Sequence, residues 1–136
     1  MEIEIGYSPC PNDCFIFDAL VHKKIDTNGI TFIPILEDVE TLNKWALKGK
    51  LPVTKLSYHT FLYVSNIYAL LKSGSALGFN CGPILISKSK AIDIKTVAIP
   101  GKNTTANLLL SFAYPTLTNK IEMLFSDIEN AVLTNK

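Results

Sequence analysis

Hydrophobic residues recur along this chain at two spacings, which alternate from the N-terminus onward. At the start, Ile3 and Ile5 alternate with Glu2 and Glu4, as in a half-buried strand. Residues 39–49 instead carry their apolar side chains at helical spacing. Together the patterns predict strand 3–7, helix 13–22, strand 30–36, helix 39–49, strand 52–56, helix 57–65 and strand 67–72. This alternation predicts an α/β fold with a parallel or mixed sheet covered by helices.

The pattern changes after residue 72. Residues 73–82 contain three glycines and predict a loop that crosses between two lobes. Beyond it we expect a strand at 83–87, a surface connection at 88–95, a strand at 96–99, a helix from Thr104, a strand at 121–125 and a last helix capped by Ser126 or Asp127. The helix from Thr104 is apolar on almost every side, which predicts that it is buried.

These elements divide the chain into a first lobe, 1–82, and a partial second lobe, 83–136. The second lobe shows no return segment that would complete its sheet. An unfinished sheet exposes apolar surface and unpaired strand edges, so we expect the chain to self-associate.

Composition excludes several classes of protein. With 136 residues, of which 48% are hydrophobic and 18% charged, the chain can bury a core and is unlike disordered sequences. The net charge is +1 and the basic residues form no stripe, which argues against nucleic acid as a partner. The chain has neither an apolar run of membrane-spanning length nor a secretion-type N-terminus, so we expect a cytoplasmic protein without a membrane partner.

The cysteines favour reduced thiols. There are three of them, an odd number, in a chain without a secretion signal. Cys10 and Cys14, with His22 beyond them, could suggest a metal site. However, Cys14 would lie within a helix and no second ligand pair follows, so we expect no metal. His22 also lies near the predicted end of its helix, where a positive charge suits the helix dipole.

A polar loop at 8–17 joins the first predicted strand to the first helix. Its two prolines fix backbone angles, so little conformational entropy remains to be lost when a ligand binds. Ser8, Pro9 and Asn12 are therefore candidates for the wall of a ligand cleft. Asn12 or Asp13 can cap the following helix. The alternative is a rigid connection without chemistry.

Residues 100–107 follow a strand and open a helix, a position where backbone N–H groups and the helix dipole favour an anion. The segment is not a P-loop, because Thr96 replaces the required glycine and Lys102 is not followed by Ser or Thr. Hydroxyls of Thr104 and Thr105 could bind a carboxylate. An ordinary capped helix start is the alternative.

A second polar strand end occurs where Lys55 and Ser57 precede the helix predicted at 57–65. In open α/β sheets ligands bind outside the carboxyl ends of strands, so Ser8, Ser57 and Thr104 can line one cleft. Lys55 could neutralise an acidic ligand or simply be solvated. His59 is a conceivable base, although a lone histidine in the first turn of a helix is more often a surface or capping residue.

Several segments together carry a resemblance to a known family. They are 8–17 (SPCPNDCFIF), 38–43 (DVETLN), 54–58 (TKLSY), 75–78 (SALG) with 82–85 (GPIL), and 99–107 (IPGKNTTAN). The chain resembles the 1,4-dihydroxy-6-naphthoate synthase family of the futalosine route to menaquinone. The related chorismate dehydratase family differs at 8–17, so this loop favours the synthase. Cys14 stands where the synthase family usually has threonine.

The resemblance implies a two-lobed fold like that of periplasmic type II binding proteins, here incomplete. It also implies a cofactor-independent lyase that converts cyclic dehypoxanthinyl futalosine to 1,4-dihydroxy-6-naphthoate by proton abstraction and elimination. The family's substrate contacts fall on Lys55, Leu56, Ser57, Thr104 and Thr105.

The family's base is a histidine that the resemblance places beyond Lys136, so the 136-residue chain is expected to be inactive. Neither His22 nor His59 matches that position. Two alternatives remain open: a lobe that binds a small carboxylate solute without chemistry, and a chorismate dehydratase of the same pathway.

Overall fold

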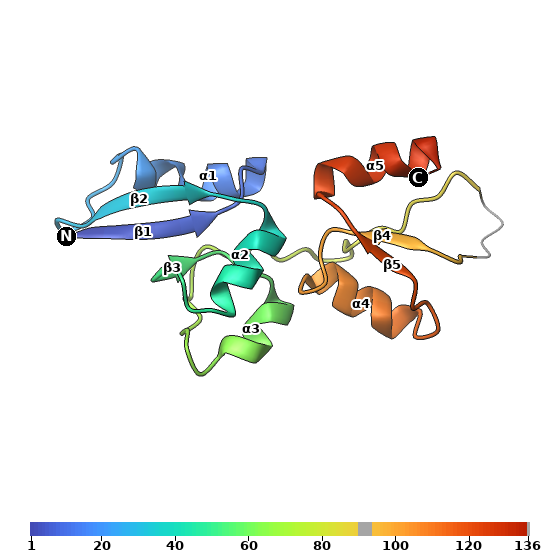
Figure 1. The fold of residues 1–136 in the computed structure, drawn as a ribbon. Helices are drawn as coiled ribbons and strands as arrows, with labels where there is room; N and C mark the ends of the chain where they lie inside the picture. The colour runs from blue at the N-terminus through green and yellow to red at the C-terminus, as the bar shows by residue number, and fades with distance from the viewer. Residues whose placement is uncertain (90–93, 136) are drawn as a thin grey trace.

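The computed structural model describes residues 1–89 and 94–135, which form five strands and five helices (Figure 1). In chain order these are β1 Glu2–Tyr7, α1 Pro11–Val21, β2 Thr31–Leu36, α2 Val39–Ala46, β3 Val53–Thr54, α3 Tyr58–Val64, β4 Val97–Ile99, α4 Thr105–Ala113, β5 Lys120–Glu122 and α5 Phe125–Thr134. The predicted α/β class is confirmed.

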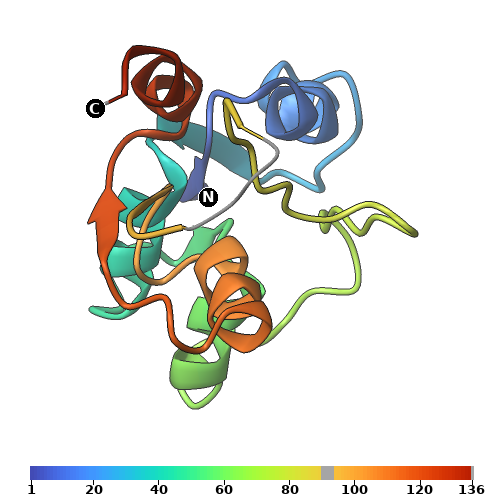
Figure 2. The same ribbon diagram turned by 90° about the vertical axis from the view of Figure 1, so that its right-hand side faces the viewer.

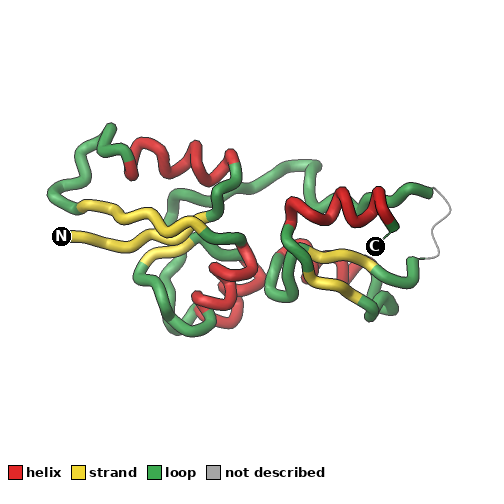
Figure 3. The backbone as a smooth tube through the Cα atoms, turned by 45° about the horizontal axis from the view of Figure 1, so that its top comes forward, coloured by secondary structure: helices red, strands yellow, loops and turns green. Residues whose placement is uncertain are grey.

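The strands form two small parallel sheets. The first has the order β2-β1-β3, with β1 paired along its whole length with β2. The second pairs β4 with β5. In Figure 1 the first sheet's strands run toward the second sheet, and β4 and β5 run back toward the first. The carboxyl ends of both sheets therefore face the same region. A long connection joins the two units, and its described residues, 65–89 and 94–96, contain no helix or strand, as the green tube in Figure 3 shows.

The packing of α2 against β1 forms the core of the first unit. Ile5, Leu42, Ala46 and Leu51 are each less than 5% exposed. A Cβ atom on Gly6 would lie 2.6 Å from Leu51 Cδ1 and 2.9 Å from Leu42 Cδ2. A larger side chain near the end of β1 would therefore displace the side chains of Leu51 and Leu42 that pack over Gly6.

The first turn of α1 differs from the sequence prediction. Cys10 is the N-cap, its Sγ accepts a hydrogen bond from Asp13 N at 3.5 Å, and Pro11 opens the helix. Proline suits this first helical position because a backbone N–H there would have no acceptor within the helix, so its absence costs no hydrogen bond. Asn12 and Asp13 were therefore wrongly predicted as caps, since both lie inside the first turn. The carboxylate of Asp13 instead turns back toward Ser8.

Helix α4 of the second unit lies beside helix α3 of the first unit. Figure 2 shows them as an orange helix next to a green one. The expectation that α4 is buried is wrong for the residues described. Leu109 is 46% exposed and Phe112 is 75% exposed. One side of α4 packs on its neighbours, while no described element covers the other side.

Two predicted strands do not form. Residues 67–72 and 83–87 have no strand structure, and Ile84 is 84% exposed. Both segments have a strand-like composition, but a strand also needs a neighbour to hydrogen-bond with, and neither has one among the described residues. The connection expected at 88–95 lies partly outside the described residues.

The last helix also starts earlier than predicted. It begins at Phe125 with Leu124 as its N-cap, and no side chain accepts a capping hydrogen bond there. Ser126 and Asp127 were wrongly predicted as caps because they lie within the first turn. The strand predicted at 121–125 corresponds to β5, which is shorter and begins one residue earlier, at Lys120.

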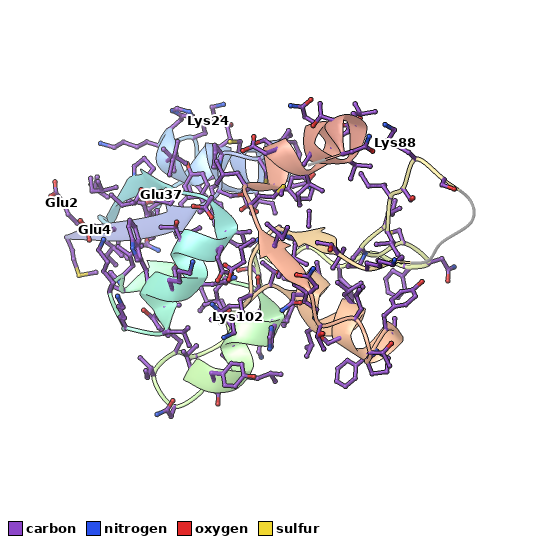
Figure 4. The ribbon with its side chains drawn as sticks, turned by 45° about the vertical axis from the view of Figure 1, so that its right-hand side comes forward. Glu2, Glu4, Lys24, Glu37, Lys88 and Lys102 are labelled. Atoms are coloured by element: carbon purple, nitrogen blue, oxygen red, sulfur yellow. The ribbon has the colours of Figure 1, made fainter. Side chains whose placement is uncertain are left out.

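Charged side chains are spread over the surface. Figure 4 labels Glu2 and Glu4 at the far end of the first sheet, Lys88 near α5 and Lys102 where the two units meet. Among the helices described in residues 1–89 and 94–135, none is both long and apolar enough to cross a membrane.

Candidate functional site

The carboxyl ends of β1 and β3 are joined by a buried carboxylate. Asp13 Oδ2 accepts hydrogen bonds from Ser8 Oγ at 2.8 Å and from Ser8 N at 3.1 Å. Its other oxygen, Oδ1, lies 2.8 Å from Lys55 Nζ. The side chain of Asp13 is 9% exposed and that of Lys55 is 23% exposed. The ammonium group thus has one anchored hydrogen bond and further N–H donors with no acceptor among the described residues.

Ser57, the residue before α3, is held by a buried amide. Asn43 Oδ1 accepts from Ser57 N at 2.8 Å, and Asn43 Nδ2 donates to Ser57 Oγ at 3.0 Å. The side chain of Asn43 is fully buried. Because the Ser57 hydroxyl accepts from Asn43, its own hydrogen is left to donate to a ligand.

The two threonines before α4 have different surroundings. Thr104 caps the helix: its hydroxyl accepts from Asn107 N at 3.2 Å, donates to Gly101 O at 2.8 Å, and is buried. Thr105 Oγ1 accepts from His59 N at 3.3 Å, which leaves its hydroxyl hydrogen to donate. Of the two side chains, only Thr105 has a donor that no described residue uses.

His59 lies at the junction of α3 and α4. Its Nδ1 is 3.2 Å from Thr104 O, and because a carbonyl can only accept, this nitrogen carries the proton. Its Nε2 then lies 3.4 Å from the Tyr63 hydroxyl. Both ring nitrogens therefore have protein partners.

Two groups of the predicted cleft residues share hydrogen-bond partners. Asp13 joins Ser8 to Lys55, and the contact between His59 and Thr105 joins α3 to α4. Leu56, between Lys55 and Ser57, is half-buried. The side chains of Pro9 and Asn12 are exposed and take no part in these contacts.

Sequence reasoning missed four polar residues that organise this region. They are Asp13, Glu40, Asn43 and Asn103. A signal was present for one of them. Asn43 lies three residues before Ala46 and therefore beside the buried apolar face of α2, where a polar residue needs a specific partner.

Two surface hollows lie nearby. One, of about 230 Å³, is bounded by α2 and by the ends of β4 and β5, and Glu40 and Lys44 line it. The other, of about 430 Å³, lies between α4 and β5, with Lys120 and Tyr114 in its wall. Neither is lined by Ser8, Lys55, Ser57, Thr104 or Thr105.

The titratable groups close to Asp13 include Tyr7 and Cys14. Burial raises the pKa of the Tyr7 hydroxyl, and the negative charges of Cys14, Asp13 and Asp18 raise it further.

All three cysteines are free thiols. Within residues 1–89 and 94–135, no group of three or more His, Cys, Asp or Glu side chains is placed to hold a metal ion.

Comparison with known proteins identifies the family. A family model described as menaquinone biosynthesis matches residues 3–136. The chain belongs to the menaquinone biosynthesis family. The match covers nearly the whole chain, and together with the names of two relatives it confirms the recognition made from the sequence segments.

Two curated relatives carry the same enzyme name, 1,4-dihydroxy-6-naphthoate synthase. The relative from Thermus thermophilus is 50% identical over 111 residues, which are 80% of this chain and 40% of that protein. The relative from Streptomyces coelicolor is 41% identical over 112 residues, which are 79% of this chain and 38% of that protein. The chain thus spans less than half the length of these members of the menaquinone biosynthesis family.

A solved structure shares the fold. A crystal structure of a protein from Archaeoglobus fulgidus superposes with a TM-score of 0.92 at 36% sequence identity. The match covers 98% of this chain and 50% of that protein. The arrangement of the two small sheets is therefore one already observed in a solved structure.

Proposed function

We propose that this chain provides the substrate-carboxylate site of a 1,4-dihydroxy-6-naphthoate synthase. The observation that carries the proposal is that Lys55, Ser57 and Thr105 each have a hydrogen-bond donor that no described residue uses. The names of the two curated relatives support it. No observation favours chorismate dehydratase or a solute-binding lobe over this function.

The chemistry of these groups suits a carboxylate. The ammonium of Lys55 supplies charge, and the hydroxyls of Ser57 and Thr105 supply directional hydrogen bonds. The N-terminus of α4 adds the positive end of a helix dipole, worth about 0.3 to 1 kcal/mol for an exposed anion. Thr104 acts by holding the first turn of α4 in place, and Leu56 offers apolar contact beside the donors.

The proposed reaction is a lyase reaction without metal or redox cofactor. A base removes a proton from cyclic dehypoxanthinyl futalosine, and elimination then cleaves a bond of the substrate, so that 1,4-dihydroxy-6-naphthoate and the remaining fragment of the substrate are released. Neither histidine of the 136-residue sequence is free for this step. His22 lies 3.6 Å from Asp18 at the surface, and both nitrogens of His59 have partners. We therefore propose that residues 1–136 bind the naphthoate product but turn over little substrate, since a general base contributes about 10² to 10⁴ in rate.

The proposed function also includes an architecture. The two sheet units are proposed as parts of two lobes, 1–82 and 83–136, of a fold like that of type II periplasmic binding proteins. The substrate would lie between them, at the facing carboxyl ends of the strands. A cytoplasmic location is part of the same proposal.

A calorimetric titration of residues 1–136 with 1,4-dihydroxy-6-naphthoate tests this function. We expect binding, and we expect Ser57→Ala to weaken it about five- to tenfold through the lost hydrogen bond. Ser65→Ala, at the other end of α3, is the matched control and should leave the affinity unchanged. A parallel assay with cyclic dehypoxanthinyl futalosine should show little naphthoate release.

Three results would contradict the proposal. Tight binding of an unrelated aliphatic carboxylate, with none of the naphthoate, would favour a solute-binding lobe. Turnover of chorismate would favour chorismate dehydratase. Efficient naphthoate release that is lost in His59→Ala would make His59 the base.

A further inference from the structure

The carboxylate of Glu40, near the start of α2, lies between the two sheet units. The residue is 5% exposed. Its two oxygens accept from the same residue of the other unit: Oε2 accepts from Asn103 N at 3.1 Å, and Oε1 from Asn103 Nδ2 at 2.6 Å. The backbone and the side chain of Asn103 are thus both fixed by one carboxylate.

The turn before α4 is shaped to receive this carboxylate. A Cβ atom on Gly101 would overlap the side chain of Glu40, so the backbone can approach only because residue 101 is glycine. Thr60, fully buried in α3, donates its hydroxyl to Asn103 O at 2.9 Å. The turn is therefore held from α2 and α3 at once.

The same carboxylate is linked to the other side of the proposed site. Asn43 Nδ2 lies 3.5 Å from Glu40 Oε2 and 3.0 Å from Ser57 Oγ. Glu40 thus connects, through one buried amide, the residue before α3 with the turn that carries Thr105. These are the two sides of the proposed carboxylate site.

The carboxylate of Glu40 forms only a weak ion pair. Its nearest cation is Lys44, whose Nζ is 3.8 Å from Oε1 and whose side chain is 56% exposed. A buried carboxylate satisfied mainly by amide and backbone donors is costly to desolvate, and its advantage is the fixed geometry of its hydrogen bonds. Asn103 offers two such donors in the spacing of a carboxylate.

We propose that Glu40 is a positioning residue, which holds the turn at 101–105 against α2 so that Ser57 and Thr105 face the same ligand carboxylate. This inference rests on the proposed function for its ligand. The contact between Glu40 and Asn103 itself can be tested without any ligand.

An exchange of the two side-chain types tests the pairing. In Glu40→Gln, the amide NH₂ of the new side chain meets the NH₂ of Asn103, and in Asn103→Asp two carboxylates face each other. In the double variant E40Q/N103D, a carboxylate at 103 faces an amide donor at 40, and the number of hydrogen bonds is restored. Glu37→Gln is the matched control, since no described residue is bonded to that carboxylate.

Two measurements are made on each variant of the 136-residue chain. Amide hydrogen exchange at Asn103 and His59 reports how firmly the turn is held. Calorimetry reports the affinity for 1,4-dihydroxy-6-naphthoate. In each single variant we expect exchange protection at both amides, and the naphthoate affinity, to fall by about tenfold or more. The double variant should recover both to within about threefold of the wild type, and the control should change neither.

The outcomes separate the two claims. A double variant no better than the single ones would overturn the pairing. Loss of protection with unchanged naphthoate affinity would overturn the positioning role, because the contact would then only stabilise the fold. If the wild-type chain does not bind the naphthoate at all, the proposed function fails, and the exchange pattern still decides whether Glu40 holds the turn.

Discussion

At the scale of single residues, the most consequential side chain is Asp13. It accepts both hydrogen bonds from Ser8 and anchors the ammonium of Lys55, three contacts that tie the loop after β1 to the end of β3. Because the carboxylate is buried, these contacts are less screened by water and salt than the surface pairs of the same helix. Asp13 therefore determines where the charge of Lys55 lies.

Asp13→Asn is expected to lower the free energy of unfolding by about 1.5 to 3 kcal/mol, because hydrogen bonds to a charged group are lost. The matched control is Asp18→Asn in the same helix, where the ion pair with Lys24 is exposed. That change should cost less than about 1 kcal/mol. Urea unfolding of both variants makes the comparison, and equal effects would contradict the central role of Asp13.

At the scale of elements, the cap of α2 controls how Glu40 and Asn43 are presented. Asp38 Oδ1 accepts from Glu40 N at 2.9 Å and from Thr41 N at 3.1 Å, and its other oxygen accepts from the Thr41 hydroxyl. Burial by itself would raise the pKa of Asp38, but these hydrogen bonds and the charge of Lys44 together outweigh burial and hold the pKa below its ordinary value. Asp38 is thus the N-cap of α2.

This cap makes stability depend on pH. Because the pKa of Asp38 is lower in the folded chain, its contribution is fully present above the unfolded value of about 3.9 and is lost as the pH falls through the folded pKa. Asp38→Ala should cost about 1 kcal/mol at pH 7. Asp38→Asn keeps a capping oxygen and should cost less than about 1 kcal/mol at pH 7, with the difference from wild type disappearing near pH 2.

Urea unfolding at both pH values measures these differences. Asp127→Ala is the control, because Asp127 lies in the first turn of α5 without capping it. It should change stability by less than about 0.5 kcal/mol. A pH-independent difference between Asp38→Asn and wild type would contradict the assigned role of the Asp38 charge.

The sequence predicted elements better than their ends and contacts. The alternation near Ile5 and the helical spacing at Leu42 locate β1 and α2, because each pattern reports which side chains face the core. The missing strand at 83–87 could not be anticipated, since strand formation depends on a neighbour that local composition does not reveal. The contact of Glu40 with Asn103 joins residues 63 positions apart, and no local pattern encodes such a pair.

At the scale of the whole molecule, two small units share a polar junction and leave much apolar surface uncovered. Phe15 and Phe79 are each 85% exposed, and Phe125 is 78% exposed. Apolar side chains gathered at a surface are a common basis for association between proteins. The self-association expected from the sequence is consistent with this exposure and stays a prediction. At the junction, in contrast, hydrogen bonds hold the two units together. They join Glu40 to Asn103, and His59 to Thr105.

The central claim is that the facing strand ends of the two units form one carboxylate site. Amide chemical shifts of the ¹⁵N-labelled chain, titrated with 1,4-dihydroxy-6-naphthoate, test it most directly. We predict saturable shifts at Lys55, Leu56, Ser57 and Thr105, with the amides of α5 unchanged. Shifts confined to the hollow between α4 and β5, or no shifts at a saturating concentration, would contradict the claim.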